Sequence, residues 1–504
     1  MGKVIFYLLV SIGLAAGLGL FYLTNRGLVS FSKPYIVQKS SDLKSPNTPV
    51  AFVNVNVVPM DSERILTNQT VIVRDGIIER IGNSGEVSVP EDAQVIEATG
   101  QYLMPGLVDM HVHIKEENEL LLFVTHGVTT VRDMWGTTGM QLRLGFPDQL
   151  QLRAQIKTGE LFGPTLYTAG PLMEGEPATS PLMPVFSTPA EAAESVVWQK
   201  TQGYDFIKVY DQLTAETYQA ILDAAQEHDL PVVGHAPKQV GLAGVLSGGQ
   251  LTIEHLTGYI DPDAADFLIP EDQLDHYAIL TREVGVWNCP TIGVYQKHVS
   301  DEALATLEAQ PEMAYISPRM KFFWKRMLRP GAMQNISYNG DYPARIAEIY
   351  TRMTRVLHEN GARIILGTDA DNPYLVSGAS LLDELDYLVE AGFTPYEAIE
   401  AGTRNAAEDL GKLDEFGTIS EGKQADLILV ADNPLQDVTH VRQRVGVMLR
   451  GYWLPETQLR ELLAELVASY TPRLTDRLWP VGMIIFFGGL ILGRFFKAER
   501  RKAS

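Results

Sequence analysis

The stretch Leu103-Met-Pro-Gly-Leu-Val-Asp-Met-His-Val-His113 decides the fold of this 504-residue chain. The apolar residues that follow its turn-forming Pro-Gly pair predict a buried strand, which ends in two histidines one residue apart. Because side chains alternate between the two faces of a strand, His111 and His113 point the same way and can share one metal ion. The chain has ten histidines, so one such pair can arise by chance. Other residues of the sequence must therefore show whether this pair binds a metal.

Short runs rich in Val, Ile and Thr recur along the chain, and most are separated by segments with helical periodicity. The eight runs are 103–113, 127–133, 164–170, 205–210, 231–235, 251–255, 286–292 and 362–369, with helices expected over 189–202, 214–229 and 342–360. Strands that alternate with helices eight times predict an α/β fold in which a parallel sheet closes into a (β/α)8 TIM barrel. In that fold the active site lies at the C-terminal ends of the strands.

Residue types that bind metals lie at or just inside five of these strand ends. They are His111 and His113, Lys208, His235, His255 and Asp369. Taken singly, each histidine can be a packing or capping residue, and Asp369 can cap the next helix. Lys208 is harder to explain in this way, because a buried lysine without a partner is costly. Together the residues predict a metal site.

With these residues in this order, the chain resembles the amidohydrolase superfamily of metal-dependent hydrolases, in its two-metal form. The resemblance covers residues 48–456. It implies one ligand set for each ion: His111, His113 and Asp369 for the first, His235 and His255 for the second. Lys208 would carry CO2 as a carbamate, whose two anionic oxygens can span two ions about 3.5–4 Å apart. Zinc is the expected metal, because it accepts imidazole nitrogen and carboxylate oxygen; manganese, iron and nickel are the alternatives.

A hydrolytic mechanism follows from such a site. Two cations lower the pKa of a shared water, so that hydroxide forms near neutral pH, and one of them polarises the substrate carbonyl. Asp369 would accept the proton of this hydroxide and pass it to the leaving group. Tyr210 shares a strand face with Lys208, so it either donates a hydrogen bond to the developing oxyanion or packs at the barrel rim. Arg132 either binds a substrate carboxylate or forms a structural ion pair with Asp133 or a neighbour.

Within the superfamily, the chain looks most similar to imidazolonepropionase and to the related prolidase-like and Xaa-Arg-type dipeptidases. Lys208 departs from imidazolonepropionase and favours two metals, whereas His235-Ala-Pro-Lys238 departs from the dipeptidase pattern. The expected activity is hydrolysis of C–N bonds in small substrates such as dipeptides or N-acyl amino acids. A lactone or ester hydrolase with the same site and a non-catalytic, membrane-tethered binding protein are the alternatives. Insertions at 171–184 and 261–340 are expected to shape the pocket.

The flanks of the barrel carry short, strand-like segments. The predicted domain boundaries place the barrel at 105–411 and these flanks at 48–104 and 412–456. In the superfamily, such flanks join into one small β-sandwich beside the barrel, and the resemblance implies the same arrangement here.

A long apolar segment lies close to each end of the chain. Residues 4–23 are long enough to form a transmembrane anchor, with a cleaved signal peptide as the alternative, and residues 478–496 predict a second transmembrane helix. The basic tail after residue 496 is typical of the cytoplasmic side. The sequence therefore predicts a lipid bilayer as partner, with the catalytic domain on the extracytoplasmic side.

The composition narrows the range of partners. A net charge of −21 argues against nucleic acid as a partner. The single cysteine, Cys289, excludes a disulfide within the chain, and its place in an apolar run predicts a core residue. The expected partner is a small-molecule substrate, and a homo-oligomer is compatible with the sequence.

Overall fold

A computed structural model describes residues 48–143, 145–262, 264–297, 301–327 and 342–471. Each of the eight predicted runs contains a strand of one parallel barrel. These strands are β6 (Leu107–Val112), β7 (Val128–Asp133), β8 (Thr165–Thr168), β9 (Ile207–Val209), β10 (Val232–Gly234), β11 (Thr252–Glu254), β14 (Trp287–Cys289) and β15 (Arg363–Ile364). They follow one another around the barrel in sequence order, as expected for repeated strand–helix units.

The barrel closes through two short contacts between its two ladders. One ladder holds β6, β7 and β8, and the other runs from β9 through β10, β11 and β14 to β15. A parallel bridge between Ala169 and Phe206 joins β8 to β9, and another between Val112 and Ala370 joins the end of β6 to the segment after β15. The amide of Met110 also donates to the carbonyl of Leu366 over 2.9 Å. This second closure brings the histidine pair of the first strand beside Asp369.

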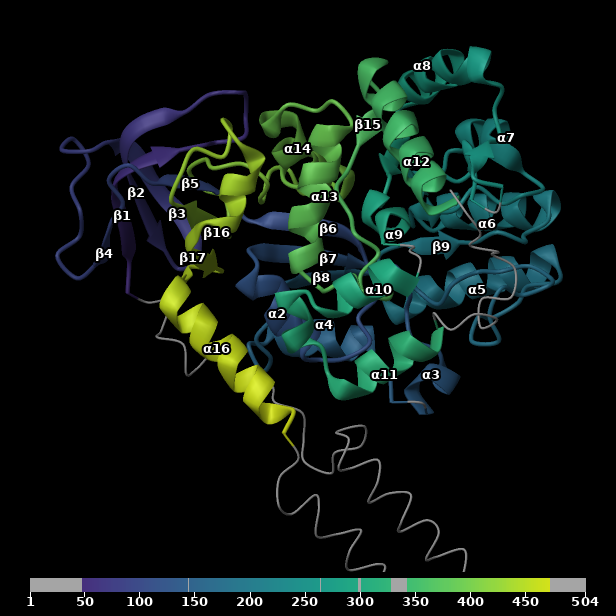
Figure 1. Cartoon of the computed structure of the whole chain (residues 1–504), viewed down its shortest axis with the longest axis horizontal. Coiled ribbons are helices and arrows are strands. Elements are labelled where there is room, and N and C mark those ends of the chain that lie inside the picture. The colour runs from purple at the N-terminus through teal and green to yellow at the C-terminus, as the bar shows by residue number, and fades with distance from the viewer. Residues whose placement is uncertain (1–47, 144, 263, 298–300, 328–341, 472–504) are drawn as a thin grey trace, which may run out of the picture.

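Helices surround the barrel (Figure 1). Those that follow barrel strands are α2 (Glu119–Thr125), α3 (Gly139–Arg143), α4 (Gln149–Lys157), α5 (Pro189–Gln202), α6 (Ala215–Glu227), α7 (Gly241–Gly248), α8 (Leu274–Val284), α12 (Tyr342–Glu359), α13 (Ala379–Glu390), α14 (Pro395–Ala401) and α15 (Arg404–Asp409). Capping residues in the sequence mark where several of these helices begin and end. Helix α5 begins at a capping box between Thr188 and Glu191, and it ends at Gly203, whose φ of 90° lies in the left-handed region.

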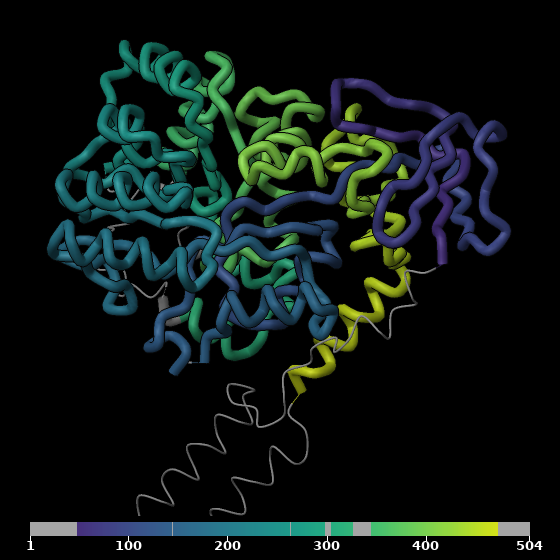
Figure 2. Tube along the Cα trace, turned by 180° about the vertical axis from the view of Figure 1, so that it is seen from behind, coloured from purple at the N-terminus to yellow at the C-terminus, as the bar shows by residue number. Residues whose placement is uncertain are grey.

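The two flanks of the barrel join in one mixed sheet. Its eight strands are β1 (Val50–Val57), β2 (Leu66–Arg74), β3 (Ile77–Asn83), β4 (Gln94–Glu97), β5 (Tyr102–Pro105), β16 (Leu427–Val430), β17 (Arg444–Leu449) and β18 (Tyr452–Pro455). Antiparallel pairing of β5 with β16 connects the N-terminal strands to the C-terminal ones. Figure 2 shows these purple and yellow segments side by side, at one side of the barrel. The expected β-sandwich is therefore observed as a single hydrogen-bonded sheet, from which helix α16 (Glu456–Ser469) follows.

The range 261–340, predicted as one long insertion, also contains the barrel strand β14 and the helix α8 before it. Its other described strands and α-helices are short: β12 (Ile260–Asp261), β13 (Asp266–Phe267), α9 (Ile292–Gln296), α10 (Asp301–Glu308) and α11 (Pro318–Met327). Trp324 of α11 is fully buried, and its ring centroid lies 5.6 Å from that of Tyr374 in the loop after β15. The insertion is therefore anchored close to the segment that carries Asp369.

The predicted transmembrane helices require a correction. Within the described residues, no helix is both long and apolar enough to cross a membrane. The longest described helix, α12, has 18 residues and carries Arg345, Arg352 and Arg355, so it lacks an apolar span. The two segments on which the prediction was based, 4–23 and 478–496, lie outside the described residues. The prediction of a membrane-anchored enzyme on the extracytoplasmic side is withdrawn.

Candidate metal centre

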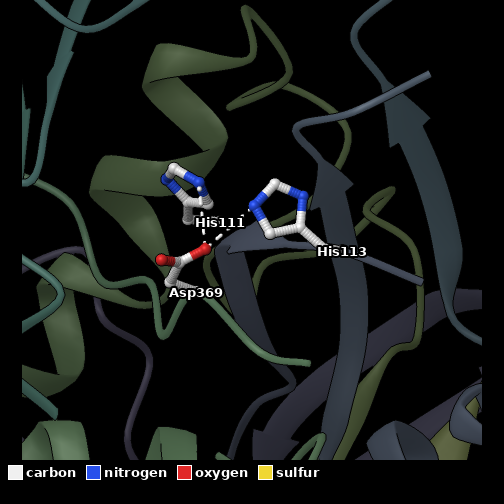
Figure 3. Close-up of side chains that lie close together, drawn as sticks. All are labelled: His111, His113 and Asp369. Atoms are coloured by element: carbon white, nitrogen blue, oxygen red, sulfur yellow. Dashed lines mark ion pairs between the residues drawn. The ribbon is translucent and has the colours of Figure 1, made fainter. Parts of the chain in front are cut away.

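His111, His113 and Asp369 meet at the C-terminal end of the barrel (Figure 3). The Asp369 Oδ1 atom lies 2.9 Å from His113 Nε2 and 3.5 Å from His111 Nε2. The backbone holds this arrangement, because the amide of Asp369 donates to the carbonyl of His111 over 2.7 Å. The three side chains form a group whose ligand atoms all lie within 4.8 Å of one another. Two histidines and a carboxylate are typical ligands of a divalent metal.

The remaining predicted ligands continue this cluster around the barrel. The ring centroid of His255 lies 4.5 Å from that of His111 and 5.0 Å from that of His235. His255 Nε2 also lies 3.9 Å from Asp369 Oδ2. Lys208, on β9, is 1% exposed, and its pKa responds to the charge of Asp369. The structure thus brings all six predicted ligands to one end of the barrel.

Several buried polar atoms of this cluster lack a hydrogen-bond partner among the described residues. His111 Nε2, His235 Nε2 and Lys208 Nζ make no hydrogen bond within the described residues. Native proteins rarely leave buried polar atoms unsatisfied, because each costs the desolvation of that group. Two imidazole nitrogens and one amine that face the same region fit a site whose cations, with a modified lysine, supply the missing partners.

Three histidines of the cluster have a close partner at their other ring nitrogen, Nδ1. His111 Nδ1 lies 2.6 Å from Glu254 Oε2, and His235 Nδ1 lies 2.7 Å from Asp211 Oδ1. His255 Nδ1 lies 2.6 Å from the hydroxyl oxygen of Thr291. Partners of this kind fix the orientation of a ring and leave Nε2 as the nitrogen that can bind a metal.

Burial sets the protonation of these groups. It lowers the pKa of His255 to about 3 and that of His111 well below its ordinary value, so that both rings are neutral and can bind a cation. It also lowers the pKa of Lys208 to about 8. Burial alone would raise the pKa of Asp369, but the electrostatic effect of the polar rings of His255 and His111 and the hydrogen bond with His113 act in the opposite direction and keep this pKa below its usual range. Asp369 is therefore a carboxylate at neutral pH.

Tyr210 lies beside the cluster, as its strand face predicted. Its ring centroid lies 4.0 Å from that of His235, and the two rings are tilted by 32°. Burial raises the pKa of the Tyr210 phenol well above its ordinary value, so that its hydroxyl keeps its proton and remains a hydrogen-bond donor.

Arg132 is buried inside the protein. Its guanidinium is fully buried and donates to the carbonyl of Met110 at 2.8 Å, to Glu254 at 2.9 Å and to Asp409 at 3.1 Å. With these contacts made, it has no free face for a substrate carboxylate. These contacts correspond to the second alternative from the sequence, a structural ion pair, in which Glu254 and Asp409 take the place of Asp133. We therefore do not propose that Arg132 binds substrate.

The sequence reasoning assigned no role to the residues that hold the histidines. Glu254 immediately precedes His255, and Asp211 immediately follows Tyr210. Glu254 therefore lies inside a run already selected for another residue, and Asp211 lies directly after one. Their partners are distant in sequence, at 143 positions for Glu254 and 24 for Asp211, so only their nearness to candidate ligands could have pointed to them.

Comparison with known proteins assigns the family. The sequence profile of the Amidohydrolase family matches residues 102–454, more than two thirds of the chain. The chain belongs to the amidohydrolase family. It is a metal-dependent hydrolase, and the resemblance seen in its strand-end residues is confirmed.

Relatives and solved structures cover most of the chain. An ochratoxinase from Aspergillus niger is 22% identical over 84% of this chain and 89% of its own length. An imidazolonepropionase from a Geobacillus strain is 24% identical over 81% of this chain and 94% of its own. The solved structure of a Bifidobacterium longum protein assigned as a prolidase is 26% identical, with a TM-score of 0.63 over 83% of this chain and 99% of that one.

Proposed function

We propose that this amidohydrolase cleaves C–N bonds of small amide substrates, such as dipeptides or N-acyl amino acids, at a centre of two divalent metal ions. One observation carries the proposal: buried nitrogens of His111, His235 and Lys208 converge on one end of the barrel and make no hydrogen bond to any described residue. We assign His111, His113 and Asp369 to the first ion, and His235 and His255 to the second. The nitrogen and oxygen ligands favour zinc.

Lys208 would hold both ions as a carbamate: its neutral amine would form an N–C bond with CO2 and release one proton to solvent. An ammonium repels cations, whereas a carbamate presents two anionic oxygens to them. Its formation requires a neutral amine, and burial provides one by lowering the pKa of Lys208 to about 8. Nζ has no hydrogen-bond partner in the part of the chain that the structure describes, which leaves this nitrogen available for the modification.

The residues around the ions supply proton transfer and orientation. Bound ions would polarise the scissile carbonyl and lower the pKa of water. Asp369, held as a carboxylate, accepts a proton from the attacking water and then delivers it to the departing nitrogen. Tyr210 keeps its hydroxyl proton and donates a hydrogen bond to the carbonyl oxygen as negative charge develops there.

The names of relatives support amide substrates of modest size. The relatives include an ochratoxinase and an imidazolonepropionase, and a prolidase assignment belongs to the similar solved structure. A lactone or ester would use the same residues, because both reactions begin with attack on a polarised carbonyl. The choice between the two bond types therefore depends on the substrate screen.

The test is a hydrolysis screen of the full chain, loaded with zinc and bicarbonate. Dipeptides and N-acyl amino acids are assayed for release of free amine, lactones and esters for release of acid, and zinc content is measured in the same samples. Asp369→Asn should lower activity about 10²- to 10⁴-fold, whereas Asp272→Asn should retain it, because Asp272 is an exposed residue of the 3-10 helix Glu271–Gln273. Zinc-loaded protein that cleaves only lactones or esters would refute the amide assignment, and protein that binds no zinc would refute the metal centre.

A further inference from the structure

A fully buried carboxylate lies directly behind the first histidine of the cluster. Glu254, the last residue of β11, is 0% exposed, and its Oε2 atom lies 2.6 Å from His111 Nδ1. Its other oxygen, Oε1, accepts hydrogen bonds from Arg132 at 2.9 Å and from the Thr252 hydroxyl at 2.5 Å. One oxygen of Glu254 is therefore directed to the histidine, and the other is held in place.

Arg132 connects this carboxylate to the frame of the barrel. Besides Glu254, it binds Asp409, the last residue of α15, at 3.1 Å. Its Nε atom donates over 2.8 Å to the carbonyl of Met110, the residue before His111 on β6. The network thus joins β6, β7 and β11 to a helix outside the barrel, and its side chains have no exposed surface. Such a network leaves Glu254 little freedom to move.

The three histidines of the cluster whose Nδ1 atoms have hydrogen-bond partners are held in different ways. The partner of His255 is the neutral hydroxyl of Thr291, and the partner of His235 is Asp211, whose side chain is 24% exposed. His111 alone of these three has a fully buried carboxylate that is itself paired with a guanidinium. A carboxylate in this position fixes the tautomer of the ring and increases its basicity as a ligand.

We propose that Glu254 is a positioning residue for the metal centre: it accepts the Nδ1 proton of His111 and so presents the Nε2 lone pair to the first ion. Arg132 and Thr252 hold Glu254 in the place that this requires. The role predicted for Arg132 in binding a substrate carboxylate is thus replaced by its binding of an internal one. This inference rests on the proposed metal centre. It adds that the affinity of the first site for its ion depends on a hydrogen-bond network inside the barrel.

The experiment measures zinc binding by the full chain, independently of catalysis. Metal-free wild-type protein and Glu254→Gln are titrated with zinc against a competing chelator, and bound zinc is counted after dialysis. We expect the variant to bind one of its two ions about ten- to a hundredfold more weakly. Circular dichroism and thermal melts of the metal-free proteins report whether the fold is preserved.

A second variant keeps the test decisive if the first does not fold. Thr252→Val removes one hydroxyl bound to Glu254 while keeping a β-branched strand residue, and we expect a smaller loss of zinc affinity in the same direction. The matched control is Thr281→Val, a buried threonine whose hydroxyl contacts Tyr259 and Tyr277 on the outside of the barrel. It should bind zinc as the wild type does.

The possible results separate the inference from the proposed function. Wild-type protein that binds no zinc would refute the metal centre and the inference together. If the wild type binds two ions and folded Glu254→Gln binds both with unchanged affinity, the positioning role is wrong and the metal centre stands. If Glu254→Gln does not fold, unchanged zinc affinity in Thr252→Val has the same meaning. A loss of affinity shared by Thr281→Val would also refute a specific role.

Discussion

Lys208 provides the sharpest test of the proposed chemistry. CO2 reacts only with a neutral amine, and burial lowers the pKa of Lys208 from 10.5 to about 8. At pH 7 roughly a tenth of the side chain is then neutral, about 300-fold more than for a lysine with an unperturbed pKa. In metal-free protein, formation of the carbamate should therefore rise with pH up to about 8 and level off above it.

The same shift makes the stability of the metal-free protein depend on pH. Between pH 8 and 10.5 the unfolded chain keeps the proton that folded Lys208 has lost, so the free energy of unfolding should rise with pH across this window. The full effect is about 3 kcal/mol. Below pH 8 Lys208 carries its proton in both the folded and the unfolded protein, so it no longer makes the free energy of unfolding depend on pH. In Lys208→Met this pH-dependent rise should be missing when unfolding is measured with denaturant.

The carbamate itself can be observed by NMR after addition of 13C-labelled bicarbonate. The wild type should show one carbamate signal, and Lys208→Ala should lack it. Lys297→Ala is the matched control, because Lys297 is also buried but its ammonium already binds the Tyr374 carbonyl and Asp383, each at 3.2 Å. Lys208→Ala should also lose zinc and activity, and short carboxylic acids should partly restore both. Full zinc content and activity in this variant without added acids would refute the reasoning.

Three further substitutions test separate roles. Asp369→Asn should lower kcat about 10²- to 10⁴-fold, because the proton acceptor is removed; steady-state kinetics with zinc counting checks this, and an effect on KM alone would contradict it. Tyr210→Phe should lower kcat about 10²- to 10³-fold if its hydroxyl stabilises the oxyanion, whereas an unchanged kcat would assign it to packing. Arg132→Met should lower the free energy of unfolding by about 3–5 kcal/mol, because buried Glu254 and Asp409 lose their counter-charge; a denaturant midpoint equal to that of the wild type would contradict the ion-pair role.

The barrel strands were predictable because their signal is local. A strand shows its period over a few residues, and the ends of parallel strands gather at one edge whatever lies between them. The opening stretch also shows where this reasoning fails. It contains two strands, β5 in the outer sheet and β6 in the barrel, divided at Gly106. A Cβ on Gly106 would lie 2.2 Å from the Thr129 hydroxyl, a close approach that sequence cannot reveal.

Partner choice inside the barrel was not predictable for a different reason. Arg132 binds Glu254 across 122 residues and Asp409 across 277, and neither separation has a period that could be recognised. A guanidinium at a strand end also fits a substrate carboxylate as well as an internal one. Only closure of the barrel, which places β7 against β6 and α15 beside β6, decides between them.

The charges beneath the cluster indicate function more than stability. Lys208, Arg132 and Glu254 are almost completely buried, and well-packed apolar residues in such places are often as stabilising as a buried ion pair or more so. Arg132 and Glu254 offset each other, but Lys208 has no hydrogen-bond partner within the described residues. A fold selected for stability alone would replace that lysine. Its presence next to neutral histidines and an ionised Asp369 is explained if this amine, which has no hydrogen bond to a described residue, is where a carbamate and two cations complete the site.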